Sequence, residues 1–431
     1  MSRIAGLLER NPTPAGMAEF PRSRASDPLR PEDDALLCCA RTRLDAGRAE
    51  RLRALLREEL DWLSLVETAL WHGLHPLLYW HLDALAAEVV PPAWKEFLRL
   101  SFEENVRRNL ALTAQLFRIL EAFQANGILG VPYKGPVLAW LAYGNLGLRE
   151  FLDLDLMVRS QDVPKASELL VSQGYRPEFE LPPARAASAQ RIPGQYMFSR
   201  GGNGDIVELH TPLTLRYYPV PLDLERLSQR LRPVSLAGRE VWTFSTEDSL
   251  SILCVHSSKH FWERLKWVCD IAELVQNPEG VNWGQAEEQA RRLGCERMLF
   301  LGLCLANDLL DAPLPEEVLR RLKANRAVES LAAQIRGQLF AHARELPGVM
   351  QRLFFRFRMR EGLWDGLRYC LRLALTPTEE DWKFLRLPAP LAPLYSVLRP
   401  LRLVRTHGWG LLRRPAPELP ARPACREKRT E

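Results

Sequence analysis

The 431-residue chain lacks the apolar runs that would place it across a membrane. No stretch approaches the ~18 uncharged apolar residues that a membrane-spanning helix needs. The N-terminal segment carries charged residues early and has no apolar core of the signal-peptide type. We therefore expect no transmembrane segment, no export and a cytoplasmic location.

Cysteine motifs are also missing. The eight cysteines are spread through mostly apolar segments, and none stands in a Cys-x-x-Cys pair or at a zinc-site spacing. This pattern argues against a thiolate zinc site. Buried, reduced thiols in a cytoplasmic protein are the simplest interpretation.

The formal net charge of +5 conceals an uneven distribution. From Gln351 onward there are seventeen Lys and Arg against eight Asp and Glu, so this part carries +9 and the first 350 residues carry −4. A basic part predicts an anionic neighbour, such as phosphate, nucleic acid or a membrane surface, although a solvated basic surface has the same composition. An apolar stripe with interleaved arginines would allow peripheral membrane contact, while a packed helix with a basic outer face is the commoner case: Leu353, Phe354, Phe357, Leu363 and Leu367.

Turn signals and apolar periodicity divide the chain into five parts, and we find no internal repeat. We expect a flexible N-terminal segment, a helical region, an α/β domain, a second helical region, and a basic amphipathic helix with a Pro/Arg-rich tail. Their ranges are 1–30, 31–125, 126–245, 246–345 and 346–431. The predicted fold class is α+β, with a small mixed-sheet domain flanked by helical regions.

Strand and helix patterns alternate inside the α/β part. Helices are predicted for PVLAWLAYG and SQDVPKASELLVSQG, and GGNGD reads as a hairpin turn. The predicted strands are ILGVPYKG, FLDLDLMV, YRPEFE, GQYMFSR, IVELHTPL and REVWTF.

Two aspartates interrupt the apolar strand LREFLDLDLMV. Residues two apart in a strand point to the same face, so Asp153 and Asp155 would lie side by side. Two like charges beside a core repel each other and lose hydration. Either a divalent cation or a pair of arginines must compensate them, and a structural Asp-x-Asp paired with Arg149 and another basic residue is the alternative.

A third carboxylate is predicted on another strand. Glu208 lies between Val207 and Leu209 in IVELHTPL and could face the aspartates, although an exposed strand residue would look the same. Three carboxylates on adjacent strands could hold two Mg²⁺ ions, with Mn²⁺ as an alternative. Such ions clamp a nucleoside triphosphate and activate an attacking oxygen.

Groups that could bind phosphate precede the aspartates. Lys134 and Gly135 close a strand just before a helix, where backbone N–H groups and a lysine can meet phosphate. Arg149 could neutralise a triphosphate or the leaving pyrophosphate, or serve as a counter-ion for the aspartates.

Several of these motifs stand together in one known family. The segments YKGPVLAW, YGNLGLREFLDLDLMV, VELH and HSSKHFWERLKWVCDIAEL resemble those of the uncharacterised nucleotidyltransferase family of bacterial proteins, in the superfamily with the DNA polymerase β-like fold. Members show Lys-Gly, an Arg shortly before Asp-x-Asp, acid-x-His, and His-x3-His with a following Asp. The resemblance spans about residues 100 to 310. Its matched positions are Lys134, Gly135, Arg149, Asp153, Asp155, Glu208, His210, His256, His260 and Asp270.

Two positions depart from the family pattern. The third acid is usually Asp, whereas Glu208 here has a side chain one methylene longer. Pro136 follows Gly135 where Gly-Ser is common, and it lacks both the hydroxyl and the N–H that would grip a phosphate. The resemblance implies a nucleotidyltransferase, and these departures bear on how active it is.

The two histidines on one predicted helical face have a supporting role in this interpretation. His256 and His260 lie four residues apart, and the face continues toward Asp270. They could bind zinc, but no third ligand has a recognisable spacing. We expect these two histidines to hydrogen-bond the α/β domain to the helices, and we count His210 and Asp270 with them as supporting residues.

The leading prediction is a Mg²⁺-dependent transfer of a nucleoside monophosphate from a triphosphate to an acceptor hydroxyl or phosphate, with release of pyrophosphate. An Asp-x-Asp glycosyltransferase using a nucleotide sugar is one alternative, although that motif usually follows a longer nucleotide-binding domain. A non-catalytic nucleotide- or partner-binding module is the other. A small molecule, peptide or saccharide acceptor is favoured over nucleic acid, because the basic residues lack interleaved aromatic side chains.

Overall fold

The computed structural model describes residues 29–178, 195–201, 205–211, 220, 222–277, 279–341, 349–376, 381, 384–385, 391 and 394–402. The chain forms two compact units, Met1–Cys370 and Leu371–Glu431. The predictions for residues 1–28, for the GGNGD turn at 202–204 and for the tail beyond 402 fall outside the described residues. Of the described cysteines, all seven are free and five are buried.

The N-terminal region of the first unit is helical, as predicted. Asp45 and Asp61 cap two of its helices, each side chain accepting a hydrogen bond from a backbone N–H three residues on. Proline in the first turn starts three others, where a missing N–H costs nothing. The helices are α2 (Pro31–Cys39), α3 (Ala46–Leu56), α4 (Trp62–His72), α5 (His75–Ala86) and α6 (Pro92–Ala125).

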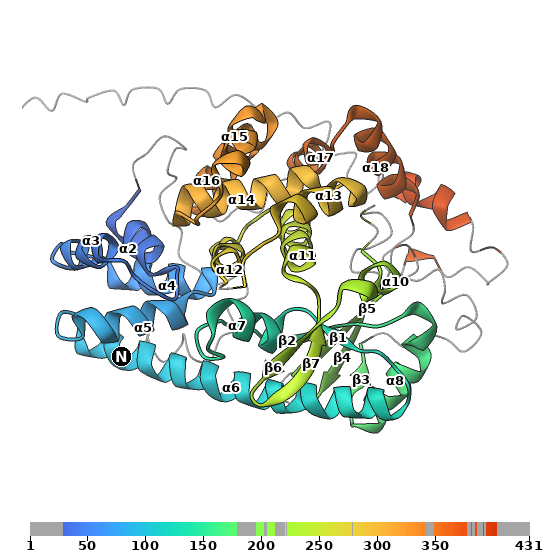
Figure 1. Ribbon diagram of the computed structural model, residues 1–431, viewed down its shortest axis with the longest axis horizontal. Helices are drawn as coiled ribbons and strands as arrows, with labels where there is room; N and C mark the ends of the chain where they lie inside the picture. The colour runs from blue at the N-terminus through green and yellow to red at the C-terminus, as the bar shows by residue number, and fades with distance from the viewer. Residues whose placement is uncertain are drawn as a thin grey trace, which may run out of the picture. The chain divides into compact units, whose positions relative to one another are not determined.

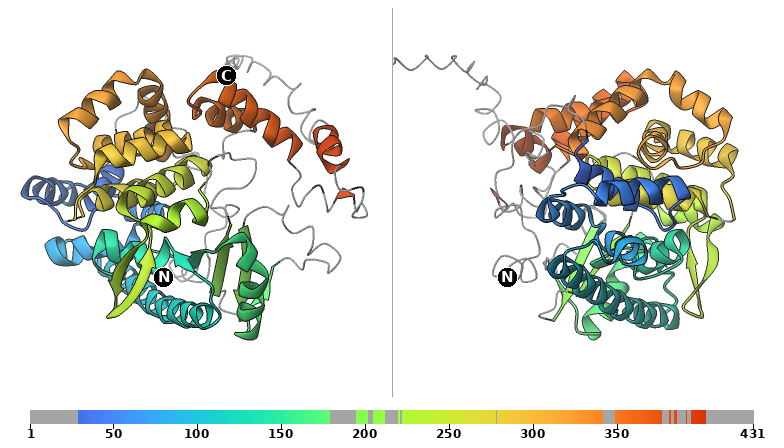
Figure 2. Two further views of the ribbon diagram at one scale, coloured as in Figure 1. Left: turned by 45° about the vertical axis from the view of Figure 1, so that its right-hand side comes forward. Right: turned by 90° about the vertical axis from the view of Figure 1, so that its left-hand side faces the viewer.

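Helix α6 is the longest described helix and passes under the sheet (Figure 1). It ends at Ala125, with Asn126 as its C-cap residue and Gly127 directly after. Its C-terminal half buries Leu112, Leu116, Ile119 and Phe123 in one core cluster with the strands. Figure 2 shows this helix from two further directions, again along the lower side of the sheet.

A five-stranded mixed sheet has the order β1-β2-β5-β4-β3. Strand β2 pairs with β5 in parallel, and the other neighbours are antiparallel. The strands are β1 (Val131–Pro132), β2 (Asp153–Met157), β3 (Arg176–Pro177), β4 (Gln195–Arg200) and β5 (Asp205–His210). Helices α7 (Gly135–Tyr143) and α8 (Val163–Ser172) follow β1 and β2, the latter after a 3₁₀ turn at Ser160–Asp162.

Alternation along β2 and β5 separates a core face from a polar face. Leu154, Leu156, Val207 and Leu209 belong to the core cluster with α6, α7 and α8. The intervening residues of both strands therefore point to the opposite face, because the side-chain period of a strand is two. This alternation explains how an apolar strand accommodates two aspartates.

A separate two-stranded sheet follows the five-stranded one. Strand β6 (Arg232–Leu236) pairs with β7 (Arg239–Thr243) in an antiparallel hairpin. The β7 strand was predicted from REVWTF, whereas β6 was not, since Pro233 interrupts its apolar pattern. A short helix α10 (Leu224–Leu227) and a 3₁₀ turn (Ser228–Arg230) precede the hairpin.

Helices make up the rest of the first unit. The helical region expected from residue 246 begins with α11 (Thr246–Lys259) and α12 (Leu265–Val275), and Ser245 is the N-cap of α11. The others are α13 (Trp283–Leu293), α14 (Glu296–Leu310), α15 (Glu316–Ala324), α16 (Arg326–Leu339), α17 (Val349–Arg358) and α18 (Leu363–Leu375), whose last residues enter the second unit.

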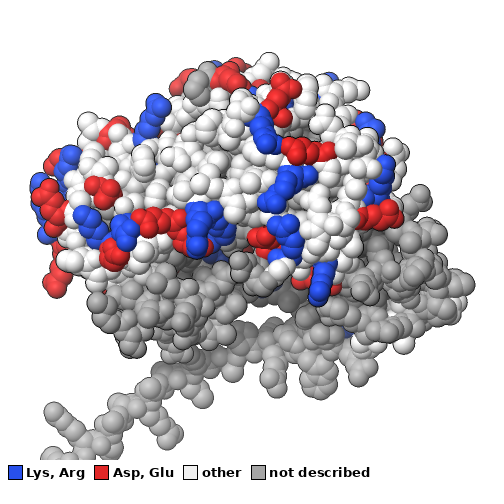
Figure 3. Space-filling view, turned by 90° about the horizontal axis from the view of Figure 1, so that it is seen from below, with Lys and Arg blue, Asp and Glu red and all other residues white. Residues whose placement is uncertain are grey.

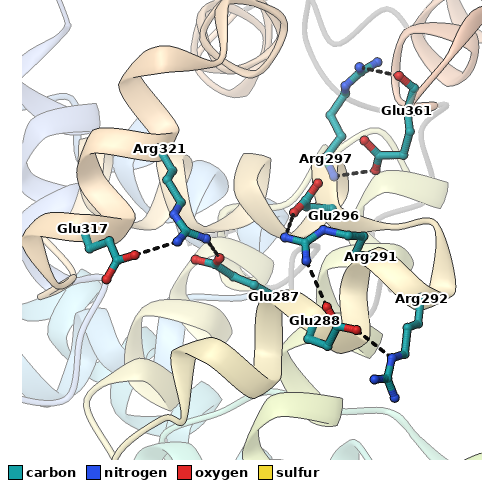
Figure 4. A network of polar contacts seen from close by, with 9 residues as sticks. All are labelled: Glu287, Glu288, Arg291, Arg292, Glu296, Arg297, Glu317, Arg321 and Glu361. Atoms are coloured by element: carbon teal, nitrogen blue, oxygen red, sulfur yellow. Dashed lines mark hydrogen bonds and ion pairs between the residues drawn. The ribbon is translucent and has the colours of Figure 1, made fainter.

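Charged side chains link three of these helices at the surface (Figure 4). Arg291 lies between Glu288, at 2.9 Å, and Glu296, at 3.1 Å. Arg321 donates to Glu317 and to Glu287. Apart from Glu287, which is buried, these acids and arginines are at least partly exposed, and such pairs contribute little individually. We therefore regard the network as orienting α13, α14 and α15 rather than as a major source of stability.

In the second unit, Asp381 is the buried centre of a polar cluster. Arg399 donates to it at 2.7 Å and Arg402 at 2.5 Å, while Arg399 also donates to the Leu373 carbonyl at 3.0 Å. These bonds neutralise the buried carboxylate.

The predicted α+β fold class, with a small mixed sheet between helical regions, is confirmed. Among the described residues, none of the helices combines the length and apolar character needed to cross a membrane. On the face shown in Figure 3, acidic and basic side chains are interspersed, and neither sign forms a continuous patch.

Candidate active site

A cleft of about 500 Å³ lies over the polar face of β2 and β5, within the first unit. Its walls come from α4, the β1–α7 junction, β2, β4, β5, α11 and α12. Nine of the ten predicted site residues line it, and the tenth, Asp270, lies behind Arg149. The fold thus gathers residues from positions 67 to 267 of the sequence around one space.

Asp155 is the most buried acid in this cleft. Its Oδ1 atom accepts hydrogen bonds from the Tyr133 hydroxyl and the Lys134 ammonium, each at 3.1 Å. The His210 Nε2 atom lies at the same distance from this oxygen. Three donors around one carboxylate oxygen compensate the loss of hydration on burial.

Glu208 lies directly opposite Asp155 in the parallel β2–β5 pair. Its Oε2 atom accepts a hydrogen bond from Gln195 Nε2 at 2.7 Å and lies 3.3 Å from His210 Nε2. Carboxylate oxygens of Asp155 and Glu208 and a ring nitrogen of His210 all lie within 4.8 Å of one another. Oxygen and imidazole nitrogen at this spacing fit the donor set of a divalent metal ion.

The electrostatics of the cluster follow from this geometry. Burial by itself would raise the pKa of Asp155, but the Lys134 charge and the His210 hydrogen bond hold that pKa below its ordinary value. Burial would also lower the pKa of His210, and its hydrogen bonds to Asp155 and Glu208 outweigh burial and raise it. Asp155 is therefore ionised and ready to bind a cation at neutral pH.

Asp153 has a different environment from Asp155. It lines the cleft half-buried, and no ion pair joins it to another side chain within the described part of the chain. Burial, followed by the charge of Asp155, raises the pKa of Asp153 to about 6. The three residues that could hold a metal ion, which we call the metal-binding group, are Asp155, Glu208 and His210. His210 stands there in place of Asp153, which the sequence predicted, so the two ligand sets share Asp155 and Glu208.

Lys134 and Gly135 form the start of helix α7. Lys134 is the N-cap residue, and Gly135 has a φ of +52°, which disfavours any residue with a Cβ. A Cβ at position 135 would also lie 3.3 Å from the Asp153 carbonyl oxygen. Glycine therefore lets the helix start approach β2 closely and brings Lys134 onto Asp155.

Arg149 is held by Asp270 rather than by the aspartates of β2. Its Nε and Nη2 atoms donate to the two Asp270 oxygens at 2.7 and 2.9 Å. Tyr143 donates to the same carboxylate at 2.8 Å, and both charged side chains are buried. This network joins the loop before β2 to α12.

The rings of His256 and His260 pack against each other, tilted by 46°, at the end of α11. Their ring centroids are 4.7 Å apart, and Trp267 lies 5.6 and 5.7 Å from them. Burial, followed by the charge of Lys259, lowers the pKa of His260 to about 3, and burial likewise lowers that of His256. Both rings are neutral at physiological pH, and the only metal-binding group found among the described residues does not include them.

Sequence reasoning missed two residues that complete the cleft. Tyr133 and Gln195 hydrogen-bond the central carboxylates. Lys259 also lines the cleft, from α11, and its pKa is lowered by burial and by the charge of Lys134. Tyr133 adjoins the recognised Lys-Gly pair and could have been found from that position. Gln195 depends on the β4–β5 register, which places it beside His210.

Known proteins give three further findings. No curated protein matches the chain. A solved structure, an antigenic nucleotidyltransferase-like protein from Paracoccidioides brasiliensis, matches with 16% identity and a TM-score of 0.29, over 50% of this chain and 98% of that one. The model of the family described as "Uncharacterised nucleotidyltransferase" matches residues 58–311, which is more than half of the sequence and contains every predicted site residue. The chain therefore belongs to this nucleotidyltransferase family.

Proposed function

We propose that the protein transfers a nucleoside monophosphate from a nucleoside triphosphate to an acceptor hydroxyl or phosphate. An acceptor oxygen attacks the α-phosphorus and forms a new O–P bond. The bond from that phosphorus to the oxygen bridging the β-phosphate breaks, and pyrophosphate leaves with the electron pair. The proton of an acceptor hydroxyl passes to a carboxylate of the cleft.

The observation that carries this proposal is the pairing of Asp155 with Glu208 beside Asp153, in a cleft of a chain from this family. Three carboxylates facing one space concentrate negative charge where divalent cations and phosphates would meet. The three side chains also lie on the face opposite the core, so their positions are not needed for packing.

Each site residue has a role in this proposal. Asp153, Asp155 and Glu208 hold the metal, and Glu208 also helps to deprotonate the acceptor. Bound Mg²⁺ or Mn²⁺, with two ions in the full site, would neutralise phosphate charge and lower the pKa of the attacking group. Lys134, the start of α7 at Gly135 and Arg149 offset the charge of the triphosphate and of the leaving pyrophosphate.

The acceptor we propose is a small molecule, a peptide or a saccharide. The charge distribution of the face in Figure 3 supports this, since basic side chains there are interspersed with acidic ones instead of forming the stripe that nucleic-acid binding uses. On α6, for example, Arg99 pairs with Glu96 and Glu103.

The location and the surface contacts are proposals as well. Free cysteines, mostly buried, suit the reducing cytoplasm. Peripheral membrane contact by the basic C-terminal part is supported by exposed apolar side chains on α17 and at the start of α18. These are Phe354, Leu363, Trp364 and Leu367, with exposed fractions of 64, 74, 81 and 52%.

The test uses triphosphates labelled on the α-phosphate, with Mg²⁺ or Mn²⁺ and small-molecule, peptide and saccharide fractions as acceptors. We expect labelled product and pyrophosphate from the wild-type protein, and neither from Asp155→Asn with an unchanged circular dichroism spectrum. Release of a sugar from a nucleotide sugar, without turnover of any triphosphate, would instead support a glycosyltransferase. Metal-independent nucleotide binding without turnover would support a binding module.

A further inference from the structure

One ligand atom of the metal-binding group is a nitrogen. His210 Nε2 lies 3.1 Å from Asp155 Oδ1 and 3.3 Å from Glu208 Oε2, so it faces the gap between the carboxylates. The His210 side chain is 5% exposed. Its other nitrogen, Nδ1, is buried and has no hydrogen-bond partner among the described residues. All of the polar interaction of this imidazole is therefore directed at the two acids.

The backbone fixes this orientation. His210 is the last residue of β5, paired with Met157 on one side and Gln195 on the other. It lies two residues after Glu208 and so points to the same face. The Tyr133 ring packs edge-on against the imidazole, with centroids 5.5 Å apart. The strand pairing of β5 and the Tyr133 ring thus both hold the imidazole beside the carboxylates.

Such a histidine can act in two ways. It can serve as a hydrogen-bond donor that holds two acids together, or its Nε2 lone pair can bind a metal ion that the acids also bind. The first role is already met by other donors, because Tyr133 and Lys134 bond Asp155 and Gln195 bonds Glu208. The second role uses a feature those donors lack, since hydroxyl, ammonium and amide N–H groups provide no nitrogen lone pair to a metal.

We propose that His210 is a metal ligand, and that two carboxylates and one imidazole make the site prefer Mn²⁺ to Mg²⁺. The proposal rests on the proposed function, because both use the Asp155–Glu208 pair. Oxygen-only sites suit Mg²⁺, whereas an imidazole nitrogen favours first-row transition ions over Mg²⁺. Mn²⁺ is the transition ion that also accepts carboxylate ligands readily.

The direct test is pulsed electron paramagnetic resonance of Mn²⁺ bound to the full-length protein, which detects coupling to a directly ligated ¹⁴N nucleus. We expect imidazole-type ¹⁴N modulation in the wild type, retained in His256→Gln and absent in His210→Gln. His256 is the matched control because it lines the same cleft outside the metal-binding group. Wild-type Mn²⁺ that shows no ¹⁴N modulation, or modulation that persists in His210→Gln, would overturn the proposal.

Competition between the two ions supplies a second measurement. We expect Mn²⁺ to bind the wild type roughly tenfold or more tightly than Mg²⁺, and His210→Gln to lose most of that preference. Equal affinities in the wild type would contradict the proposal without depending on the folding of a variant. Nucleotidyl transfer with no ¹⁴N signal would refute this inference alone. A nitrogen-ligated Mn²⁺ site that binds no triphosphate would refute the proposed function instead.

Discussion

Asp155 on β2 and Glu208 on β5 are direct partners in a parallel strand pair, and their side chains face the same cleft. Parallel neighbours lie about 4.8 Å apart, so two carboxylates are held close together by backbone hydrogen bonds instead of by a loop. A site on such a rigid element changes little when one side chain is substituted. The predictions below use this rigidity to separate chemical effects from folding effects.

The first prediction concerns the charge and the length of the Glu208 side chain. Glu208→Gln removes the charge while preserving shape, and we expect a fall in transfer rate of about 10²–10⁴-fold, the range for loss of a general base. Glu208→Asp restores the acid common in the family and should retain clearly more activity than Glu208→Gln. Steady-state rates with labelled triphosphate measure both. Equal losses in the two variants would show that Glu208 does not act through its charge.

Removing the Lys134 charge should change the affinities for cations and for nucleotides in opposite directions. Its ammonium bonds Asp155 and would compete with a cation for that carboxylate, so Lys134→Met should tighten Mn²⁺ binding by about tenfold, because a hydrogen bond to a charged group contributes roughly 1.5 kcal/mol. The same variant should weaken triphosphate binding. Calorimetric titration with each ligand measures the two effects.

A suitable control for that experiment is Lys165→Met, because Lys165 is exposed and bonds only the Asn126 carbonyl among its described contacts. It should change neither affinity. If Lys134→Met weakened the binding of Mn²⁺ and of triphosphate equally, general damage to the cleft would be the better explanation.

The buried pair of Arg149 and Asp270 should be the most sensitive polar contact in the first unit. Asp270→Asn leaves a buried guanidinium without its counter-ion, and we expect a loss of about 3–5 kcal/mol in the free energy of unfolding. Urea denaturation measures it. Glu288→Gln, in the exposed network of Figure 4, should have little effect. Similar losses in the two variants would contradict the assigned difference in burial.

Glu150 should link stability to pH. Burial raises its pKa, but Lys266 at 3.3 Å, with smaller effects of His75 and Arg108, outweighs burial and lowers that pKa to about 2. Between its unfolded pKa of about 4.5 and pH 2, the Glu150 carboxyl is protonated in the unfolded chain and ionised in the folded chain. The free energy of unfolding therefore falls as the pH falls. The contribution is full above pH 4.5 and amounts to about 3 kcal/mol.

Urea denaturation of the wild type and Glu150→Gln at pH 7, 5.5, 4.5 and 4 tests this linkage. The wild type should be the more stable protein at pH 7, and the gap should begin to narrow below about pH 4.5. A gap that is constant across this series would show that Glu150 stabilises the fold through packing alone.

The sequence predicted the parts of the site that follow from local pattern. Alternation in FLDLDLMV and IVELHTPL identified Asp153, Asp155 and Glu208 as polar-face residues, and the strands confirm that alternation. The Lys-Gly pair was predicted to lie just before a helix, and the structure places it at the start of α7, where Gly135 lets the helix approach β2 closely.

Other features depended on contacts that no local pattern contains. Arg149 and Asp270 are 121 residues apart in sequence, so their pairing follows from the packing of α12 against the loop before β2. Likewise, His210 belongs to the metal-binding group because the β2–β5 register places it beside Asp155, and sequence alone gave it only a supporting role.

The most direct measurement is calorimetric titration of the wild-type protein and Asp155→Asn with each of the four ribonucleoside triphosphates, with and without Mg²⁺ or Mn²⁺. We expect at least one triphosphate to bind the wild type only when a divalent ion is present, and this binding to be lost in the variant. Binding that is independent of metal and unchanged in Asp155→Asn, or no binding of any triphosphate, would contradict a metal-dependent nucleotidyltransferase site built on Asp155.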